Sequence, residues 1–261
     1  MAVENTKEWL RKYVNDPLQL CNKLTRYFPA ISKQQLLSYL QQFGMYRNSK
    51  KAEVDFEQLQ EEQVWNQVER LFSKYQKQWE GPDIPVFILP HKGQTLFRNG
   101  HNKSGLAFND KLFLFVSPKL STNHLEALFI HEYHHVCRFN KQNKNLEEYT
   151  LAESIILEGL AEYTVEQLLD RRYVAPWIKR YSHSFLKQFW KETFKENLGL
   201  TRKEKRHEVL LYGKGGYPSM IGYSMGFFLV EQYMQKHAFD ISSSFELSAE
   251  AVCDYEHDGE K

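Results

Sequence analysis

The pentapeptide H-E-Y-H-H at residues 131–135 constrains this chain more than any other feature. It places His131 and His135 four residues apart in an apolar stretch that is typical of a buried helix. Residues four apart on a helix share a face, one turn apart, so the two imidazoles can bind one ion. Glu132 follows the first histidine, where its carboxylate can reach a water molecule on that ion. The pattern predicts a Zn²⁺ site with an open position for water.

Two other interpretations of this pentapeptide remain open. His134 could form the ligand pair with His131, because residues three apart on a helix are also neighbours. The segment could also be a helix whose histidines are structural or exposed. We favour His131 and His135, because only that pair places Glu132 in the position of the general base.

A third protein ligand is predicted on a second helical stretch. In one large class of zinc sites a glycine and a third histidine follow at fixed spacing, but Arg138 and Lys141 stand there instead. The run L-E-G-L-A-E at residues 157–162 places Glu158 and Glu162 on a mostly apolar helix face. Buried carboxylates are costly unless a metal, hydrogen bonds or cations compensate them. We therefore predict Glu158 as the third ligand.

Other residues of the same stretch are expected to support the site. Glu162 is predicted to accept a hydrogen bond from the free N–H of a ligand histidine, His131, with a structural ion pair as the alternative. Glu153 is the fallback ligand, although it points away from the Glu158 face. Gly159 would let this helix approach its neighbour closely.

The pentapeptide and residues 157–162 together resemble the gluzincin class of metallopeptidases. More narrowly, the chain resembles the YjaZ-like family of predicted zinc-dependent proteases of Gram-positive bacteria, from about residue 84 to about residue 250. The resemblance implies a thermolysin-like metal core, peptidase activity and a bacterial cytoplasmic protein. It also implies that an edge strand just before the zinc helix binds extended peptide. Many gluzincins carry Asp where this chain has Glu162.

The composition agrees with a folded cytoplasmic enzyme. The 261 residues are 42% hydrophobic, which is enough for a substantial core. The 34 basic and 33 acidic side chains nearly balance, so we expect no nucleic-acid partner. No apolar run is long enough for a membrane span or a signal peptide, so we expect no membrane partner. Three widely spaced cysteines fit a reducing compartment, and Cys137 is expected to be a buried apolar residue.

The chain is predicted to have three regions. Residues 1–80 are expected to form an N-terminal helical subdomain, residues 81–250 the catalytic domain, and residues 251–261 a polar tail. In the middle region, residues 84–89 predict a strand, and residues 105–116 predict a hairpin with a two-residue turn. The expected fold is α+β and predominantly helical, with a small, mostly antiparallel sheet packed on the zinc-binding helix pair.

Two helix starts are predicted from local signals. Asn123 is expected to be the N-cap of the zinc helix, with Glu126 three residues later completing a capping box. Further along, Pro218 is expected in the first turn of a helix that runs to about residue 235.

The residues together predict a zinc-dependent metallopeptidase. Zinc held by His131, His135 and Glu158 would polarise the scissile carbonyl and lower the pKa of its water from about 15.7 towards 7. Glu132 would accept the water proton and deliver it to the leaving amine. The expected substrate is a peptide or protein.

A tetrahedral oxyanion needs a second electrophile besides the metal. Tyr223 is the first candidate, because it lies beside Gly222 and Gly226 on a helix that is expected to pack closely on another. Tyr217 and His207 are the alternatives.

Two other functions stay open. The protein could be a metal-binding regulator or sensor with little proteolytic activity, but structural zinc sites usually have four protein ligands and are rich in Cys. It could also hydrolyse a non-peptide amide or act as an aminopeptidase, although a G-x-M-E-N exopeptidase signature is absent. Cobalt or manganese could replace zinc in any of these functions.

Overall fold

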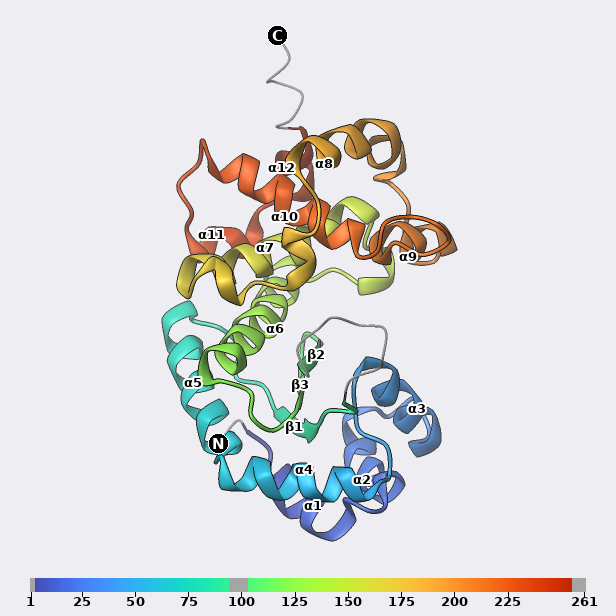
Figure 1. Ribbon diagram of the computed structural model, residues 1–261, viewed down its shortest axis with the longest axis vertical. Helices are drawn as coiled ribbons and strands as arrows, with labels where there is room; N and C mark the ends of the chain where they lie inside the picture. The colour runs from blue at the N-terminus through green and yellow to red at the C-terminus, as the bar shows by residue number, and fades with distance from the viewer. Residues whose placement is uncertain (1–2, 94–102, 255–261) are drawn as a thin grey trace. The chain divides into compact units, whose positions relative to one another are not determined.

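The computed structural model describes residues 3–93 and 103–254 (Figure 1). The chain forms two compact units, Met1–Val136 and Cys137–Lys261, and their boundary falls inside helix α6 (Thr122–Gln142). The predicted domain boundaries at 80/81 and 250/251 were drawn from composition and stay predictions. Residues 255–261, predicted as a polar tail, lie outside the described residues.

The first unit begins with five helices, which confirms the helical prediction for this region. Side-chain caps begin three of them: Asp16 and Ser49 accept backbone N–H groups at the starts of α2 and α4, and Ser32 forms a capping box with Gln35 at the start of α3. The helices are α1 (Thr6–Tyr13), α2 (Pro17–Leu24), α3 (Lys33–Phe43), α4 (Lys50–Glu61) and α5 (Val64–Trp79).

A three-stranded sheet follows, with strand order β1-β3-β2. Its strands are β1 (Val86–Pro90), β2 (Lys103–Ala107) and β3 (Leu112–Val116). The predicted hairpin is confirmed: β2 and β3 pair antiparallel, and the N–H of Phe108 donates to the carbonyl of Lys111 over 2.9 Å. However, β1 pairs parallel to β3, so the sheet is mixed and not mostly antiparallel. The strand directly before α6 is the central, buried β3, and the edge strand on that side is β2.

Aromatic packing against α5 determines which face of α6 is buried in the first unit. The ring of Tyr133 lies 5.5 Å from Phe72 and 5.7 Å from Trp79, and the ring of Phe129 lies 6.0 Å from Tyr75. The Tyr133 hydroxyl also donates to the carbonyl of Pro82 over 2.9 Å. These contacts lie on one side of α6, and His131 lies on another side of the helix.

The predicted start of α6 is wrong by a short distance. The helix begins at Thr122, before the expected N-cap Asn123, and the N–H of Leu125 donates to the carbonyl of Ser121. Glu126 does not form a capping box but accepts hydrogen bonds from Lys74 and from the Tyr75 hydroxyl, at 2.7 and 2.8 Å. Ser121 is an equally good cap residue two positions earlier, and local pattern alone does not choose between the two.

The second unit is built on helix α7 (Leu151–Leu168) packed against α10 (Ile221–Met234), as Figure 1 shows. Their backbones touch where two glycines meet: a Cβ on Gly226 would lie 1.7 Å from the Ile155 carbonyl oxygen, and one on Gly159 would lie 2.3 Å from Gly226. The predicted close approach of Gly159 is therefore confirmed. Around this pair lie α8 (His183–Phe189), α9 (Lys205–Tyr212), α11 (Ile241–Glu246) and α12 (Ala249–Asp254).

Residues 171–200, between α7 and α9, form a series of short helical turns that include η4 (Pro176–Lys179), α8 and a π-helical turn. The predicted start of the helix after α9 differs from the structure. Helix α10 begins at Ile221, not near Pro218, because Met220 has the left-handed conformation with φ 59°. A residue with positive φ interrupts the helical hydrogen-bond ladder, so the Pro218 prediction is wrong.

The last turns of α6 are anchored by a buried arginine. Arg138 is 1% exposed, and its guanidinium donates to the carbonyls of Ser244, Phe245 and Leu247 at 2.8, 3.3 and 2.6 Å. These are carbonyls at the end of α11 that a helix leaves without partners. Burial lowers the pKa of Arg138 to about 10, so it remains charged at neutral pH. Cys137 is buried as predicted.

Among residues 3–93 and 103–254, no helix combines the length and the apolar character needed to cross a bilayer.

Candidate metal centre

The two predicted imidazole ligands converge on one point. The Nε2 atoms of His131 and His135 lie 3.0 Å apart, with ring centroids 4.6 Å apart and planes at 81°. Two nitrogens bound to one tetrahedral zinc ion at about 2.0–2.1 Å lie roughly 3.4 Å from each other. The observed spacing is thus close to what a shared ion requires.

His134 belongs to the packing of the first unit. Its ring is fully buried and meets Trp79 edge-on, with centroids 6.5 Å apart and planes at 80°. Since Trp79 is on the α5 side of the helix, the geometry favours the pair His131 and His135 over the alternative with His134.

The predicted base, Glu132, lies against the edge strand β2. A Cβ on Gly105 would lie 2.3 Å from the carboxylate carbon of Glu132 and 2.6 Å from its Oε1. A side chain at this position of β2 would therefore displace the Glu132 carboxylate. Glu132 is 8% exposed, so the strand and its own helix largely enclose the carboxylate.

Helix α7 presents Glu158 and excludes the fallback ligand. Glu153 forms a capping box with Thr150, whose N–H donates to its carboxylate over 2.8 Å. The ammonium of Lys144 donates to both Glu153 oxygens, at 2.6 and 2.8 Å. Through these interactions Glu153 caps the start of α7. Glu158, one residue before the glycine contact with α10, is half-buried.

One group of described residues could hold a metal ion. His131, His135 and Glu158 each offer one ligand atom, and these atoms all lie within 4.8 Å of one another. Two imidazoles and a carboxylate, with a glutamate directly after the first histidine, are the donor set of zinc hydrolases. The residue chemistry therefore fits zinc.

The second predicted carboxylate of α7 also has a local partner. Glu162 is 7% exposed, and its Oε2 accepts the N–H of Ala175 over 2.8 Å. This bond holds the segment before η4 against α7. The predicted hydrogen bond to a ligand histidine stays a prediction.

The three oxyanion candidates have different surroundings in the second unit. His207 is buried, and its Nε2 lies 2.9 Å from the hydroxyl of Ser154, a contact that links α9 to α7. Burial also lowers the pKa of His207. Tyr217 packs edge-on against Phe189, with ring centroids 6.2 Å apart. Tyr223 is half-buried beside Tyr212, with ring centroids 5.9 Å apart. These contacts describe how each side chain is packed, and Tyr223 stays the predicted oxyanion donor, with Tyr217 and His207 as the alternatives.

Tyr212 is a residue of interest that sequence reasoning missed. Burial raises the pKa of Tyr212, and the negative charge of Glu158 raises it further. The phenol therefore lies within electrostatic reach of the candidate ligand. It ends α9 and belongs to no motif, so its position became apparent only from the packing of α9.

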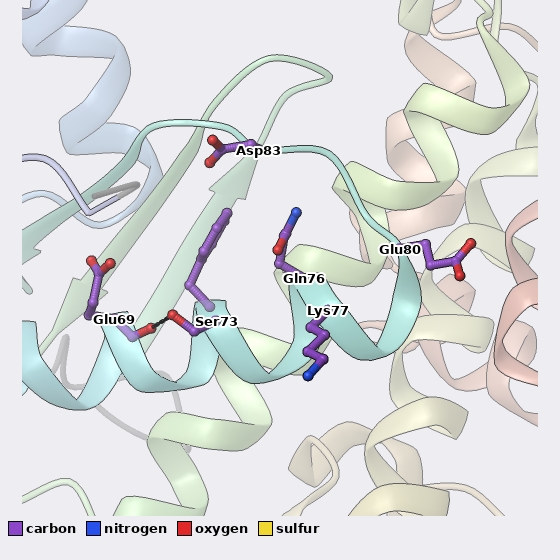
Figure 2. Close-up of a pocket in the computed structure, with 7 residues that line it drawn as sticks. Glu69, Ser73, Gln76, Lys77, Glu80 and Asp83 are labelled. Carbon is purple, nitrogen blue, oxygen red and sulfur yellow. Dashed lines mark hydrogen bonds between the residues drawn. The ribbon is translucent and has the colours of Figure 1, made fainter.

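A shallow hollow along α5 contains none of the predicted site residues. Figure 2 shows Glu69, Ser73 and Lys77 on this helix and Asp83 on the loop after it. The Ser73 hydroxyl donates to the Glu69 carbonyl over 2.9 Å, an ordinary bond within a helix. We assign no function to this hollow.

The donor set of His131, His135 and Glu158 fits a zinc site, and comparison with known proteins agrees with that metal. Residues 64–254 match the family described as "Predicted Zn-dependent protease (DUF2268)". The chain belongs to this family, which confirms the resemblance to the YjaZ-like family.

Two relatives come from Bacillus subtilis (strain 168), and both are described as uncharacterized proteins. YjaZ is 33% identical over 261 residues, which cover 97% of this chain and 99% of YjaZ. YjfC is 23% identical over 137 residues, which cover 49% of this chain and 46% of YjfC. No solved structure matches the chain.

Proposed function

We propose that this protein is a zinc-dependent metallopeptidase that hydrolyses peptide bonds. The observation that carries the proposal is the grouping of His131, His135 and Glu158, whose ligand atoms lie within 4.8 Å of one another. Membership of a family of predicted Zn-dependent proteases supports both the metal and the substrate class.

The residues have distinct roles in the proposed reaction. His131, His135 and Glu158 would hold the zinc ion, which when bound supplies a Lewis acid for a carbonyl and for water. Glu132 accepts a proton from the attacking water and delivers it to the leaving amine. Tyr223 donates a hydrogen bond to the oxyanion that develops on the scissile carbonyl.

The edge strand β2 supports a peptide as the substrate. Among the described residues, β2 pairs only with β3, and all five of its residues are partly exposed. An extended peptide could add to such an edge through backbone hydrogen bonds. Glu132 lies directly against this strand at Gly105, so a peptide bound there would pass close to the base.

Cleavage of a peptide library tests the proposal. Zinc-loaded protein is expected to cleave a subset of peptides, and chelation followed by zinc addition should abolish and restore cleavage. Glu158→Ala should weaken zinc binding by well over tenfold in calorimetric titration, because a direct ligand matters more than the residues around it. Tight zinc binding without cleavage of any peptide would contradict the peptidase and support a regulator or sensor.

A change on β2 tests the position of the base. Gly105→Ala introduces a methyl group that overlaps the Glu132 carboxylate, which must move because the strand backbone cannot. We expect kcat to fall by roughly 10–100-fold, the typical cost of a misplaced catalytic group. Zinc affinity should stay within about twofold, since no ligand is displaced.

Gly199→Ala is the matched control, because no atom lies within 4 Å of a Cβ at that position. Equal kcat values for the two variants would show that Glu132 does not depend on its place beside β2.

A further inference from the structure

The end of α9 and the start of α10 are held together by backbone contacts. Gly213 has φ 66°, and a Cβ there would lie 1.8 Å from the Pro218 carbonyl oxygen. The Tyr212 carbonyl accepts the N–H of Met220 over 2.9 Å. A Cβ on Gly222 would lie 2.7 Å from the Cα of Leu211. The two helix ends therefore have little freedom to move relative to each other.

This junction places two tyrosines against each other. Tyr212 is the last residue of α9 and Tyr223 lies in the first turn of α10. Their rings are 5.9 Å apart with planes at 33°, and a side-chain hydrogen bond joins them. Trp177 meets the Tyr223 ring edge-on, with centroids 5.8 Å apart, so the phenol is packed between two aromatic rings.

The same junction is connected to the candidate zinc ligand. Glu158 directly precedes Gly159, and Tyr223 lies three residues before Gly226, so both start from the contact between α7 and α10. Burial raises the pKa of the Tyr212 phenol, and the negative charge of Glu158 raises it further, whereas Arg202 and the hydrogen bond with Tyr223 lower it. A tyrosine side chain is a neutral phenol at physiological pH, so Tyr212 can donate a hydrogen bond.

We propose that Tyr212 is a positioning residue that holds the Tyr223 hydroxyl in place for the oxyanion. Each phenol has a single proton to donate. When Tyr223 donates its proton to the reacting oxygen, Tyr212 becomes the donor to Tyr223 and keeps that hydroxyl oriented. The inference rests on the proposed peptidase function and assigns a second phenol to the same centre.

Kinetics of Tyr212→Phe test this role. Loss of an oxyanion donor costs about 100-fold or more in kcat, which is what we expect for Tyr223→Phe. Tyr212→Phe should lower kcat by about tenfold with KM within about twofold, because only the orientation of the donor is lost. The double variant should be no slower than Tyr223→Phe alone, since the two residues act as a unit.

Tyr163→Phe is the matched control. Tyr163 is also a half-buried phenol with a pKa raised by burial, but it packs on Phe227 and Phe239. Its kcat should equal that of the wild type within about twofold. Multiplicative losses in the double variant, or equal effects of the Tyr212 and Tyr163 changes, would overturn the proposal.

A structural measurement separates this inference from the peptidase function. In a crystal structure of Tyr212→Phe, the Tyr223 hydroxyl should leave its wild-type position while α9 and α10 stay in place. An unmoved Tyr223 would refute the positioning role even if the enzyme is active. A moved Tyr223 in a protein that cleaves no peptide would uphold the positioning and refute only the peptidase.

Discussion

Glu132→Gln is expected to abolish peptide hydrolysis while leaving zinc binding intact. Glutamine has the same shape as glutamate and fits the same enclosed site against Gly105, but its amide cannot accept the proton of the attacking water. Loss of a general base and acid typically costs 10²–10⁴-fold, so kcat/KM should fall by roughly that factor. Zinc affinity should be nearly unchanged, because Glu132 is not a predicted ligand. Steady-state kinetics and calorimetric zinc titration measure the two effects.

A control on the same helix makes this test specific. Glu126 also lies on α6, but its carboxylate accepts hydrogen bonds from Lys74 and Tyr75. Glu126→Gln should therefore keep kcat/KM within about twofold, the usual scale for a change outside the active site. Residual hydrolysis by Glu132→Gln at the level of this control would show that the base is another residue.

Gly226→Ala is expected to destabilise the second unit strongly. Its methyl group would lie 1.7 Å from the carbonyl oxygen of Ile155 and 2.6 Å from the carbonyl carbon, both in the backbone of α7. A flexible side chain could rotate away, whereas a helix backbone can relieve the overlap only by moving α7 from α10. Overpacking of this kind costs about 3 kcal/mol. For a chain of this size, the thermal midpoint should then fall by roughly 6–12 °C.

Thermal unfolding followed by circular dichroism provides the measurement. Gly199→Ala again serves as the control, because its methyl group would meet no atom within 4 Å. A midpoint for Gly226→Ala within about 2 °C of this control would mean that α7 and α10 can move apart with little loss of stability. We also expect weaker zinc binding by Gly226→Ala, since Glu158 is adjacent to the contact.

The candidate site could be predicted from the sequence as far as its chemistry depends on local spacing. His131 and His135 share a helix face because of their spacing alone, and the structure brings their Nε2 atoms to 3.0 Å. The β2–β3 hairpin was equally predictable, since two apolar runs flank the polar pair Asn109 and Asp110. Gly159 was expected to allow a close contact, and its partner helix proved to be α10.

Features that depend on contacts between distant segments were not predictable in this way. Tyr212 gains its significance from the left-handed Gly213 and from Gly222, which fix α9 against α10. No spacing rule singles out a tyrosine at a helix end. The parallel pairing of β1 with β3 was missed for the same reason, because pairing across 26 residues leaves no local signature.

The setting of Arg138 has a consequence for proteolytic trimming of the chain. Its guanidinium lies one turn beyond His135 in the same helix, and the carbonyls that accept its protons belong to residues 244–247. A chain cut before residue 244 would keep every predicted ligand yet remove all three of these carbonyls from a buried cation, a loss that costs several kcal/mol. Removal of residues 244–247 would thus destabilise the end of α6, more than 100 residues earlier in the chain.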